Sequence, residues 1–408
     1  DMKVWHQMFE GLYGMDESGE GYYQELAKDV QLNDDETEYT ITLQDGVKFQ
    51  NGEDLKASDV VFSYERAMDN PAWGHLTEPI EKIEAIDDAT VKFTLKYPYA
   101  PIDHTFFCIK ISSEKEVTEQ GEKYGTIPHK AGTGPYYVEE YDAASGVKLK
   151  AFEDYWRGAP EIKALNYQVM TDDSAAVVAF ENGELDYLDE APLSDWDSLS
   201  KAAGDNSKMI KGNNILWFGI NYAANDVLAN DKVREAIFYA INKEDINVAV
   251  CNGLGATTSQ YMPSEYVETS PVDGFETYDY NPDKAKELLA EAGYADGVDV
   301  GTILTGGTKN DKMAQVIQAN LAAVGIKAEV SVMDISIVSE KWFTQEFDMC
   351  VYADSGNYDF NNIRQQVHSE SVGMYCIKYK DGPFDWKHME ELIEKAAAIK
   401  DVDQRLEY

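Results

Sequence analysis

The amino-acid sequence predicts an α/β protein with more than one domain, and three observations support that fold class. Helical and strand-like hydrophobic patterns interleave along the whole chain. The chain has 408 residues, of which 44% are hydrophobic, so it is long and apolar enough for two or three domains. At Val324-Gly325-Ile326 a helical pattern passes directly into a strand pattern, which is typical of an αβ unit.

The most informative local pattern lies in residues 39–71. Apolar Tyr39, Ile41 and Leu43 alternate with polar residues, which predicts a half-buried strand. Asp45-Gly46 predicts a turn, and Val47 and Phe49 resume the alternation, which predicts a second strand. Asn51-Gly52 then predicts another turn.

A helix is predicted after this strand pair. Ser58 stands where an N-cap belongs, and Asp59 falls in the first turn, where the helix dipole favours negative charge. The apolar residues of one helical face are Val60, Val61, Tyr64, Ala67 and Met68.

Further helices are predicted in the second half of the chain. Asp231 is expected to cap one, and Asn281-Pro282 opens another. Gly293 and Gly325 end the second and the third of these helices. Their apolar faces consist of Val233, Ala236, Ile237, Ala240 and Ile241, of Ala285, Leu288, Leu289 and Ala292, and of Met313, Val316, Ile317, Leu321 and Val324. Alternation over residues 326–332 predicts a following strand.

The charge of the chain excludes one class of partner. Asp and Glu number 75 against 35 Lys and Arg, a formal net charge of −40. A field of that sign repels polyanions, so no nucleic-acid partner is predicted, and cationic ligands are favoured. No apolar run reaches the ~18 residues of a membrane span. The chain opens on DMKVWHQMFEGLYG, which has no signal-peptide pattern and is expected to be the inside of a domain in a mature or truncated form.

Motifs for catalysis and metal binding are missing from the sequence. The six histidines form no HExxH pair, and neither a GxSxG elbow nor a GxxxxGK[ST] phosphate loop occurs. Gly132-Thr133-Gly134 is followed by Pro135 and is interpreted as a turn. We therefore predict no catalytic residue, no metal site and no cofactor, with a metal held by distant histidines as the alternative. Cys108, Cys251, Cys350 and Cys376 lack metal-site spacing and are either buried thiols or one or two disulfides.

Residues 39–71 resemble, in the same order, the signature of the peptide/nickel class of ABC-transporter extracellular solute-binding proteins (family 5, which includes oligopeptide- and dipeptide-binding proteins). Residues 132–187, 213–246 and 347–360 resemble three further blocks of that family, in the family's order. The resemblance covers nearly the whole chain.

The resemblance implies an α/β, periplasmic-binding-protein-like fold with two lobes (type II, cluster C-like) and an extra subdomain in the first lobe. Residues 1–14 would be a partial start of lobe I, and residues 15–131 would be the subdomain. Residues 132–221 would complete lobe I. Residues 222–408 would form lobe II, with the family's C-terminal return to lobe I absent.

The same resemblance implies function. The chain would be the extracytoplasmic solute-binding component of a bacterial ABC importer, a monomer that captures peptides between its lobes by hinge closure and docks on a membrane permease. No reaction would be catalysed. The expected location is periplasmic or extracellular, with a lipid anchor in Gram-positive hosts and an export signal outside the present sequence.

Ligand-binding residues are predicted around Asp354. By the resemblance, Asp354 pairs with the ligand's α-amino group through a charge-assisted hydrogen bond, with Asp359 as the nearest competitor. Val351, Tyr352 and Ala353 would offer backbone groups to an extended peptide, as an added strand does.

Aromatic residues are the other candidates for the ligand-binding wall. Trp217 and Phe218 lie near the predicted crossing between lobes, and Trp386 and Tyr352 are similar cases. Each either lines the cleft or packs in the core. Trp156 is expected to pack beside Arg157-Gly158.

One departure from the family bears on the kind of ligand. Dipeptide binders carry an arginine before the helix that matches residues 313–324, and it clamps the ligand carboxylate. Here that place reads TILTGGTKND, and Lys309 lacks the bidentate fork of an arginine. Oligopeptides or another cationic solute therefore fit better than dipeptides. Rival cargoes are a nickel chelate or an oligosaccharide, and rival classes are a two-domain hydrolase and an extracellular sensor or chaperone.

Overall fold

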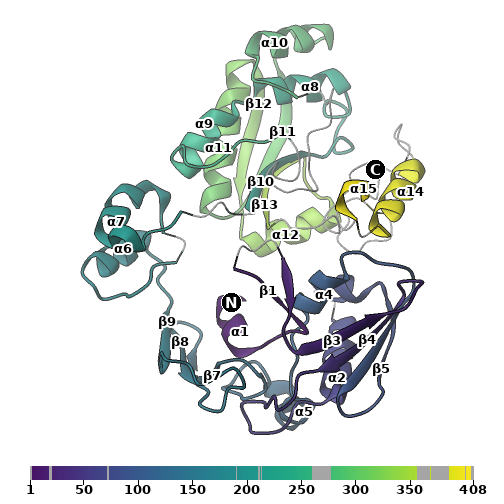
Figure 1. The fold of residues 1–408 in the computed structure, drawn as a ribbon. Coiled ribbons are helices and arrows are strands. Elements are labelled where there is room, and N and C mark those ends of the chain that lie inside the picture. The colour runs from purple at the N-terminus through teal and green to yellow at the C-terminus, as the bar shows by residue number, and fades with distance from the viewer. Residues whose placement is uncertain are drawn as a thin grey trace. The chain divides into compact units, whose positions relative to one another are not determined.

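A computed structural model of the chain describes residues 2–17, 21–70, 73–189, 191–209, 212, 214–259, 277–355, 368, 386–399 and 401–405 (Figure 1). Its contacts divide the chain into two compact units. Unit 1 comprises Asp1–Thr171, Asp359–Val372 and Lys380–Tyr408, and unit 2 comprises Asp172–Tyr358 and Gly373–Tyr379.

These units are defined by contacts and do not correspond one to one with the predicted lobes. Residues 380–408 belong to unit 1 by their contacts, whereas we predicted them in lobe II. The Ala100 amide, for instance, donates to the Ala397 carbonyl at 3.0 Å. The lobe boundaries at 132 and 222 stay predictions.

Unit 1 carries antiparallel sheets (Figure 1). Its helices are α1 (Met2–Met8), α2 (Ala57–Met68), α3 (Gly74–Thr77), α4 (Ile102–Cys108), α5 (Glu114–Gln120), α14 (Trp386–Ala397) and α15 (Val402–Arg405). Its strands are β1 (Tyr13–Met15), β2 (Tyr22–Gln24), β3 (Ala27–Leu32), β4 (Glu38–Leu43), β5 (Ile80–Ala85), β6 (Thr90–Leu95), β7 (Tyr136–Asp142), β8 (Gly146–Ala151) and β9 (Ala164–Gln168). They form the sheets β1-β2, β3-β4-β6-β5 and β7-β8-β9.

The predicted strand at residues 39–43 is confirmed as β4, with Tyr39, Ile41 and Leu43 buried. The predicted helix is confirmed as α2, which packs on β5 and β6 of the same sheet. Tyr64 from α2 meets Phe93 of β6 edge to face, with ring centroids 4.9 Å apart. The alternating strand and the amphipathic helix thus bury their apolar sides against each other.

The second predicted strand of this segment is wrong. Val47 and Phe49 are both buried, but the segment makes only an isolated bridge between Lys48 and Asp54. The Phe49 amide donates to Glu53 and the Leu55 amide donates to Val47. Because the loop hydrogen-bonds to itself, it does not join a sheet.

The predicted helix caps are shifted. Ser58 is the second residue of α2, and Lys56 occupies the N-cap. The side chain that reaches the N-cap amide is Asp59, which accepts from the Lys56 N–H at 3.0 Å. In unit 2, Asn230 and not Asp231 is the N-cap, and it accepts from the Lys232 amide. An acid in the first turn can reach back, so the cap need not be the residue that sequence favours.

Unit 2 contains a mixed sheet in the order β10-β13-β11-β12 (Figure 1). Its strands are β10 (Asn214–Ile220), β11 (Val298–Thr305), β12 (Ile326–Val332) and β13 (Met349–Ser355). Its helices are α6 (Asp173–Glu181), α7 (Trp196–Ala203), α8 (Asp231–Ala240), α9 (Lys243–Cys251), α10 (Pro282–Glu291), α11 (Thr308–Ala323) and α12 (Ile335–Thr344). Strand β10 runs antiparallel to β13, and β11 runs parallel to both β12 and β13.

The predicted helical faces of unit 2 are confirmed. Asn281 caps α10 by accepting from the Lys284 amide, and Pro282 is its first residue. Gly293 and Gly325 have φ of 89°, the left-handed conformation that ends a helix. The core contains buried residues from α8, α10, α11 and the sheet.

Gly132 and Gly134 serve close packing within unit 1. The Gly134 amide donates to the Met8 carbonyl at 2.9 Å, where α1 ends. The Gln50 side-chain amide, 5% exposed, donates to the carbonyls of Met8, Gly134 and Tyr136. A Cβ atom on Gly132 would lie 1.9 Å from the Met8 oxygen. The two glycines therefore permit α1 to approach the start of β7.

Cys108, Cys251 and Cys350 are thiols, and Cys376 lies outside the described residues. In the described part of the chain, no helix has the length and apolarity needed to cross a membrane.

We predict that Gly132→Ala destabilises the protein by about 1–3 kcal/mol or more, because the new methyl group overlaps the Met8 carbonyl. Urea denaturation of both proteins measures the loss. Gly212→Ala is the matched control, because the nearest atom to its Cβ would be 4.0 Å away. Equal stabilities of the two variants would contradict the packing role of Gly132.

Candidate functional site

The antiparallel pair β10–β13 brings together most of the predicted ligand-binding residues. Trp217 lies opposite Tyr352, and Phe218 lies opposite Val351. The backbone of Asp354 lies opposite Ile215, one residue before the end of β13. Residues more than a hundred positions apart in sequence therefore share one two-stranded ladder.

The two faces of this ladder have different environments. Val351 is fully buried and Phe218 partly buried in the main core of unit 2, against which α11 packs. Their side chains are core residues, so Val351 can offer a ligand only its backbone. Trp217 and Tyr352 lie on the opposite face with residues of α12.

An aromatic cluster forms on the α12 face and consists of Trp217, Trp342, Phe347 and Tyr352. The ring centroids of Trp217 and Trp342 are 4.5 Å apart, and those of Trp342 and Phe347 are 4.8 Å apart. The rings of Trp342 and Tyr352 are stacked, with centroids 6.5 Å apart. The Tyr352 hydroxyl lies 2.8 Å from the Ser339 hydroxyl of α12. The cluster holds the Tyr352 ring from several sides.

Sequence reasoning did not identify Trp342 or Ser339. A usable signal was present, because Val338 and Trp342 are spaced i, i+4. Such a pair predicts a helix whose apolar side faces the sheet.

The ladder of β13 is complete on one side only. On the β10 side, pairing continues from Met349 to Ser355. On the β11 side, the described pairing consists of Ile303 with Met349 and Leu304 with Cys350. Strand β11 ends at Thr305. Within the described residues, Val351–Ser355 therefore have no strand partner along that edge, which we call the open edge of β13.

Two glycines follow the last residue of β11. Gly307 has φ of 92°, and a Cβ atom there would meet nothing within 4 Å. Gly307 is also the N-cap of α11, and no side chain caps that helix end. Exposed Lys309 follows in the first turn. Where β11 stops pairing with β13, the chain thus passes into the N-terminus of a helix, whose dipole favours negative groups.

The remaining predicted residues are placed as follows. The side chain of Asp354 and the whole of Asp359 lie outside the described residues. Trp386 is half-buried at the start of α14, which belongs to unit 1. It is therefore not in the compact unit that contains β10 and β13.

A cavity of about 500 Å³ lies at the other end of β13. Its lining residues are Asn221, Ala223, Ala224, Thr302, Gln345, Glu346, Phe347 and Asp348. The Asp348 carboxylate accepts from the Thr302 amide at 2.9 Å and from the Thr302 hydroxyl at 3.1 Å. Asp348 precedes β13, whereas the predicted ligand residues lie in its second half, so this cavity is separate from them.

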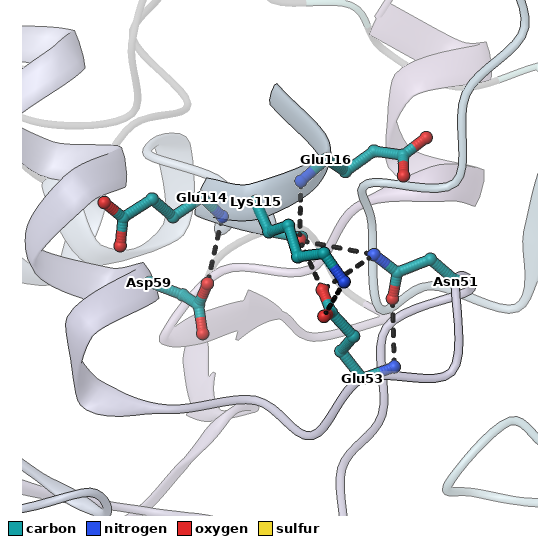
Figure 2. Close-up of polar contacts among 7 residues, drawn as sticks. Asn51, Glu53, Asp59, Glu114, Lys115 and Glu116 are labelled. Carbon is teal, nitrogen blue, oxygen red and sulfur yellow. Dashed lines mark hydrogen bonds and ion pairs between the residues drawn. The ribbon is translucent and has the colours of Figure 1, made fainter. Parts of the chain in front are cut away.

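The family-like signature segment of unit 1 is held by the polar network of Figure 2. Asp59 is 8% exposed, and its two carboxylate oxygens accept from the amides of Lys56 and Glu114. Burial raises the pKa of Asp59, and the two backbone hydrogen bonds oppose that rise. One carboxylate thus satisfies amides at the N-termini of both α2 and α5.

The partners of Asn51 and Glu53 complete this network (Figure 2). Glu53 accepts from Lys115 at 2.7 Å and from Asn51 at 3.1 Å. The hydrogen bond from Lys115 lowers the pKa of Glu53. Ser113 caps α5 by accepting from the Glu116 amide at 3.2 Å. The network joins the turn at Asn51-Gly52 to the N-termini of α2 and α5.

The described part of the chain contains no group of three or more histidine, cysteine, aspartate or glutamate residues that could hold a metal ion.

The family model for "Bacterial extracellular solute-binding proteins, family 5 Middle" matches residues 21–366. This match covers most of the chain, and the chain belongs to that family. The resemblance noted in the signature segment is thereby confirmed.

A curated relative gives the same assignment. The glutathione-binding protein GsiB of Salmonella typhi is 31% identical over 339 residues, which is 80% of this chain and 64% of the relative. The chain thus spans 64% of the length of that relative.

Solved structures show the same fold. The oligopeptide-binding protein AppA from Bacillus subtilis, in complex with a nonapeptide, superposes with a TM-score of 0.81 at 23% identity, covering 100% of this chain and 84% of AppA. NikZ from Campylobacter jejuni, in complex with Ni(L-His), gives a TM-score of 0.78 at 21% identity, covering 99% and 84% of the two chains. The predicted two-lobed, periplasmic-binding-protein-like α/β fold is confirmed.

We predict that Asp59→Asn costs about 1–3 kcal/mol of stability, because an amide has one acceptor oxygen and leaves one buried N–H unsatisfied. Thermal or urea denaturation measures this loss. Glu53→Gln is the control and should cost less than about 1 kcal/mol, because the Glu53–Lys115 pair is solvent-accessible. Similar losses in both variants would show that Asp59 does not hold the two helix ends.

Proposed function

We propose that this chain is the solute-binding component of a bacterial ABC importer and that its solute is an oligopeptide. Family membership supports the general role, and the open edge of β13 carries the choice of a peptide. The protein would bind its solute outside the cytoplasm, close its lobes around it, and deliver it to a membrane permease without cleaving it. We further propose that it acts as a monomer.

The open edge offers backbone groups of the kind that an extended peptide needs. Val351–Ser355 pair with β10 along one side, and the other side lacks a described strand partner. Backbone groups on that side require hydrogen bonds. An extended peptide supplies them by adding a strand, and this mode of binding does not depend on the peptide's side chains.

The charges near this edge give the peptide an orientation. We propose that Asp354, near the end of β13, pairs with the α-ammonium group of the peptide. The place before α11 that would hold a carboxylate clamp has Gly306-Gly307 and Lys309 and no arginine. A lysine is a weaker, less directional clamp than an arginine. Oligopeptides, whose C-terminus extends beyond this point, are therefore favoured over dipeptides.

Glutathione is the second candidate solute, and the relative GsiB supports it. That protein is named as a glutathione-binding protein and is 31% identical to this chain. Glutathione also carries an ammonium group, so Asp354 would serve either ligand. Solved structures of the same fold include complexes with a nonapeptide and with Ni(L-His), and fold alone does not select the cargo.

We predict that oligopeptides bind and are released intact. Calorimetry with a random oligopeptide pool should show saturable binding, and mass spectrometry of the recovered pool should find no shortened peptides. Glutathione and Ni(L-His) are titrated in parallel. If glutathione saturates the protein and the peptides do not bind, glutathione is the solute. Recovery of cleaved peptides would show that the protein does more than bind them.

We predict that Asp354→Ala weakens peptide affinity by about thirty-fold or more, because losing one member of a desolvated charge pair costs about 2–5 kcal/mol. N-acetylation of the peptide should weaken binding to the unmodified protein by a similar factor. The two losses should not add, since both remove the same contact. Calorimetry measures each combination.

Asp359→Ala is the control for this cycle and should have a much smaller effect. If Asp354→Ala binds free and acetylated peptides as tightly as the unmodified protein does, Asp354 does not recognise the ammonium group.

A further inference from the structure

Tyr22, His104, Cys108 and Lys110 form a cluster in unit 1 that the proposed function does not use. His104 lies within α4, and Cys108 is the last residue of that helix. Because the two residues are four positions apart, their side chains lie on the same helix face. The Cys108 sulfur lies 3.3 Å from His104 Nε2. On the other side of the ring, the Tyr22 hydroxyl of β2 lies 2.8 Å from His104 Nδ1. The imidazole thus connects a phenol and a thiol.

His104 is uncharged at neutral pH. It is 6% exposed, and burial lowers its pKa from 6.5 to about 4. In the tautomer with hydrogen on Nε2, His104 accepts from the Tyr22 hydroxyl at Nδ1 and donates from Nε2 to the Cys108 sulfur. A hydrogen bond donated to the sulfur favours the thiolate over the thiol.

Lys110 provides positive charge at the same place. It is 7% exposed, and within the described residues its ammonium has no hydrogen bond or ion pair. Nζ lies 4.3 Å from the centroid of the Phe107 ring. Burial lowers the pKa of Lys110, while the charges of Glu25, Cys108 and Glu10 raise it. A buried cation that interacts with a thiol stabilises the thiolate over the thiol.

The two neighbouring carboxylates have their own partners. Glu10 accepts from the Tyr155 hydroxyl at 2.7 Å and from the Trp156 indole at 2.9 Å. Glu25 accepts from the Gly11 amide at 3.2 Å and pairs with Arg157 at 3.5 Å. Two further ionisable groups interact with the cluster: His6 interacts electrostatically with Lys110, and buried Tyr64 interacts with Cys108.

The other described cysteines lack this environment. Cys350 is fully buried, and burial raises its pKa to about 12. Cys251 is the last residue of α9 and is half-buried, as Cys108 is. Among the described residues, neither has a histidine contact. Cys251 is therefore a control of matched exposure.

We propose that Cys108 is a reactive thiol, activated by His104 and Lys110, that exchanges with low-molecular-weight disulfides. Cys108 gives its proton to solvent, and the thiolate, stabilised by the His104 Nε2–H and by the Lys110 charge, attacks one sulfur of a disulfide R–S–S–R. A Cys108–S–S–R bond forms, the R–S–S–R bond breaks, and the leaving thiolate R–S⁻ takes a proton from solvent. The disulfide is the oxidant, so the step is balanced. This modification site is additional to the proposed solute binding.

The test compares thiols within the reduced full chain. Iodoacetamide labelling at pH 5 to 9, followed by peptide mass mapping, gives a separate rate for each cysteine. Cys108 should react about tenfold faster than Cys251 at pH 7, because a larger fraction is thiolate. Its rate should also rise at lower pH than that of Cys251. Oxidised glutathione should add one reducible adduct, at Cys108. Equal rates for Cys108 and Cys251, or an adduct only on another cysteine, would overturn the proposal.

Variants separate the two activating groups. Lys110→Met and His104→Gln should each bring the Cys108 rate close to that of Cys251. Lys163→Met, an exposed lysine paired with Glu153, should leave the rate unchanged. Tyr22→Phe removes the hydroxyl that bonds His104 Nδ1 and should shift the pH at which labelling begins. Unchanged Cys108 labelling in all three variants of the cluster would refute activation by these groups. If a variant does not fold, the comparison of Cys108 with Cys251 in the unmodified chain still tests the proposal.

Discussion

The backbone of β13 has to satisfy hydrogen bonds on two sides, and the way it does so organises unit 2. Pairing with β10 runs the full length of β13, while described pairing with β11 stops at Cys350. Near Met349 and Cys350, β13 is therefore paired on both sides. From Val351 to Ser355 its described pairing is with β10 alone, although the Val351 side chain packs in the core with α11. A strand edge without a partner is a site for adding a strand, which is why this interruption supports the proposed peptide binding.

Unit 1 depends on buried carboxylates that hold loops and helix ends. Asp59 accepts from amides at the starts of α2 and α5, and Glu10 accepts from Tyr155 and Trp156, which lie far along the chain. A buried carboxylate is costly unless it is hydrogen-bonded, so each one fixes the positions of its donors. In a chain of net charge −40, most acids are solvated, and these few act as structural junctions.

The aromatic cluster links the open edge to α12. Trp217 and Tyr352 are cross-strand neighbours, and Trp342 packs against both. Cross-strand aromatic pairs stabilise a ladder, and a third ring from a helix restricts their rotamers. The rings of Trp217 and Tyr352 are therefore held in position by their neighbours.

The sequence by itself determined the elements with strong periodicity. These are β4, α2, α8, α10, α11 and β12, because apolar spacing and Asn281 or Gly325 specify them locally. The sequence also indicated the protein family, because residues 39–71 retain the signature of family 5 solute-binding proteins. It failed at Val47 and Phe49, whose alternation reflects burial in a self-bonded loop. The sequence identified Trp217, Phe218 and Val351 as candidates for ligand binding. It could not say which side of the sheet each side chain occupies, because that depends on the register between β10 and β13, which are distant in sequence. The contacts of Asp59 with Glu114, of Trp217 with Trp342, and of Tyr22 with His104 arise only when segments distant in sequence pack, so tertiary structure alone decided them.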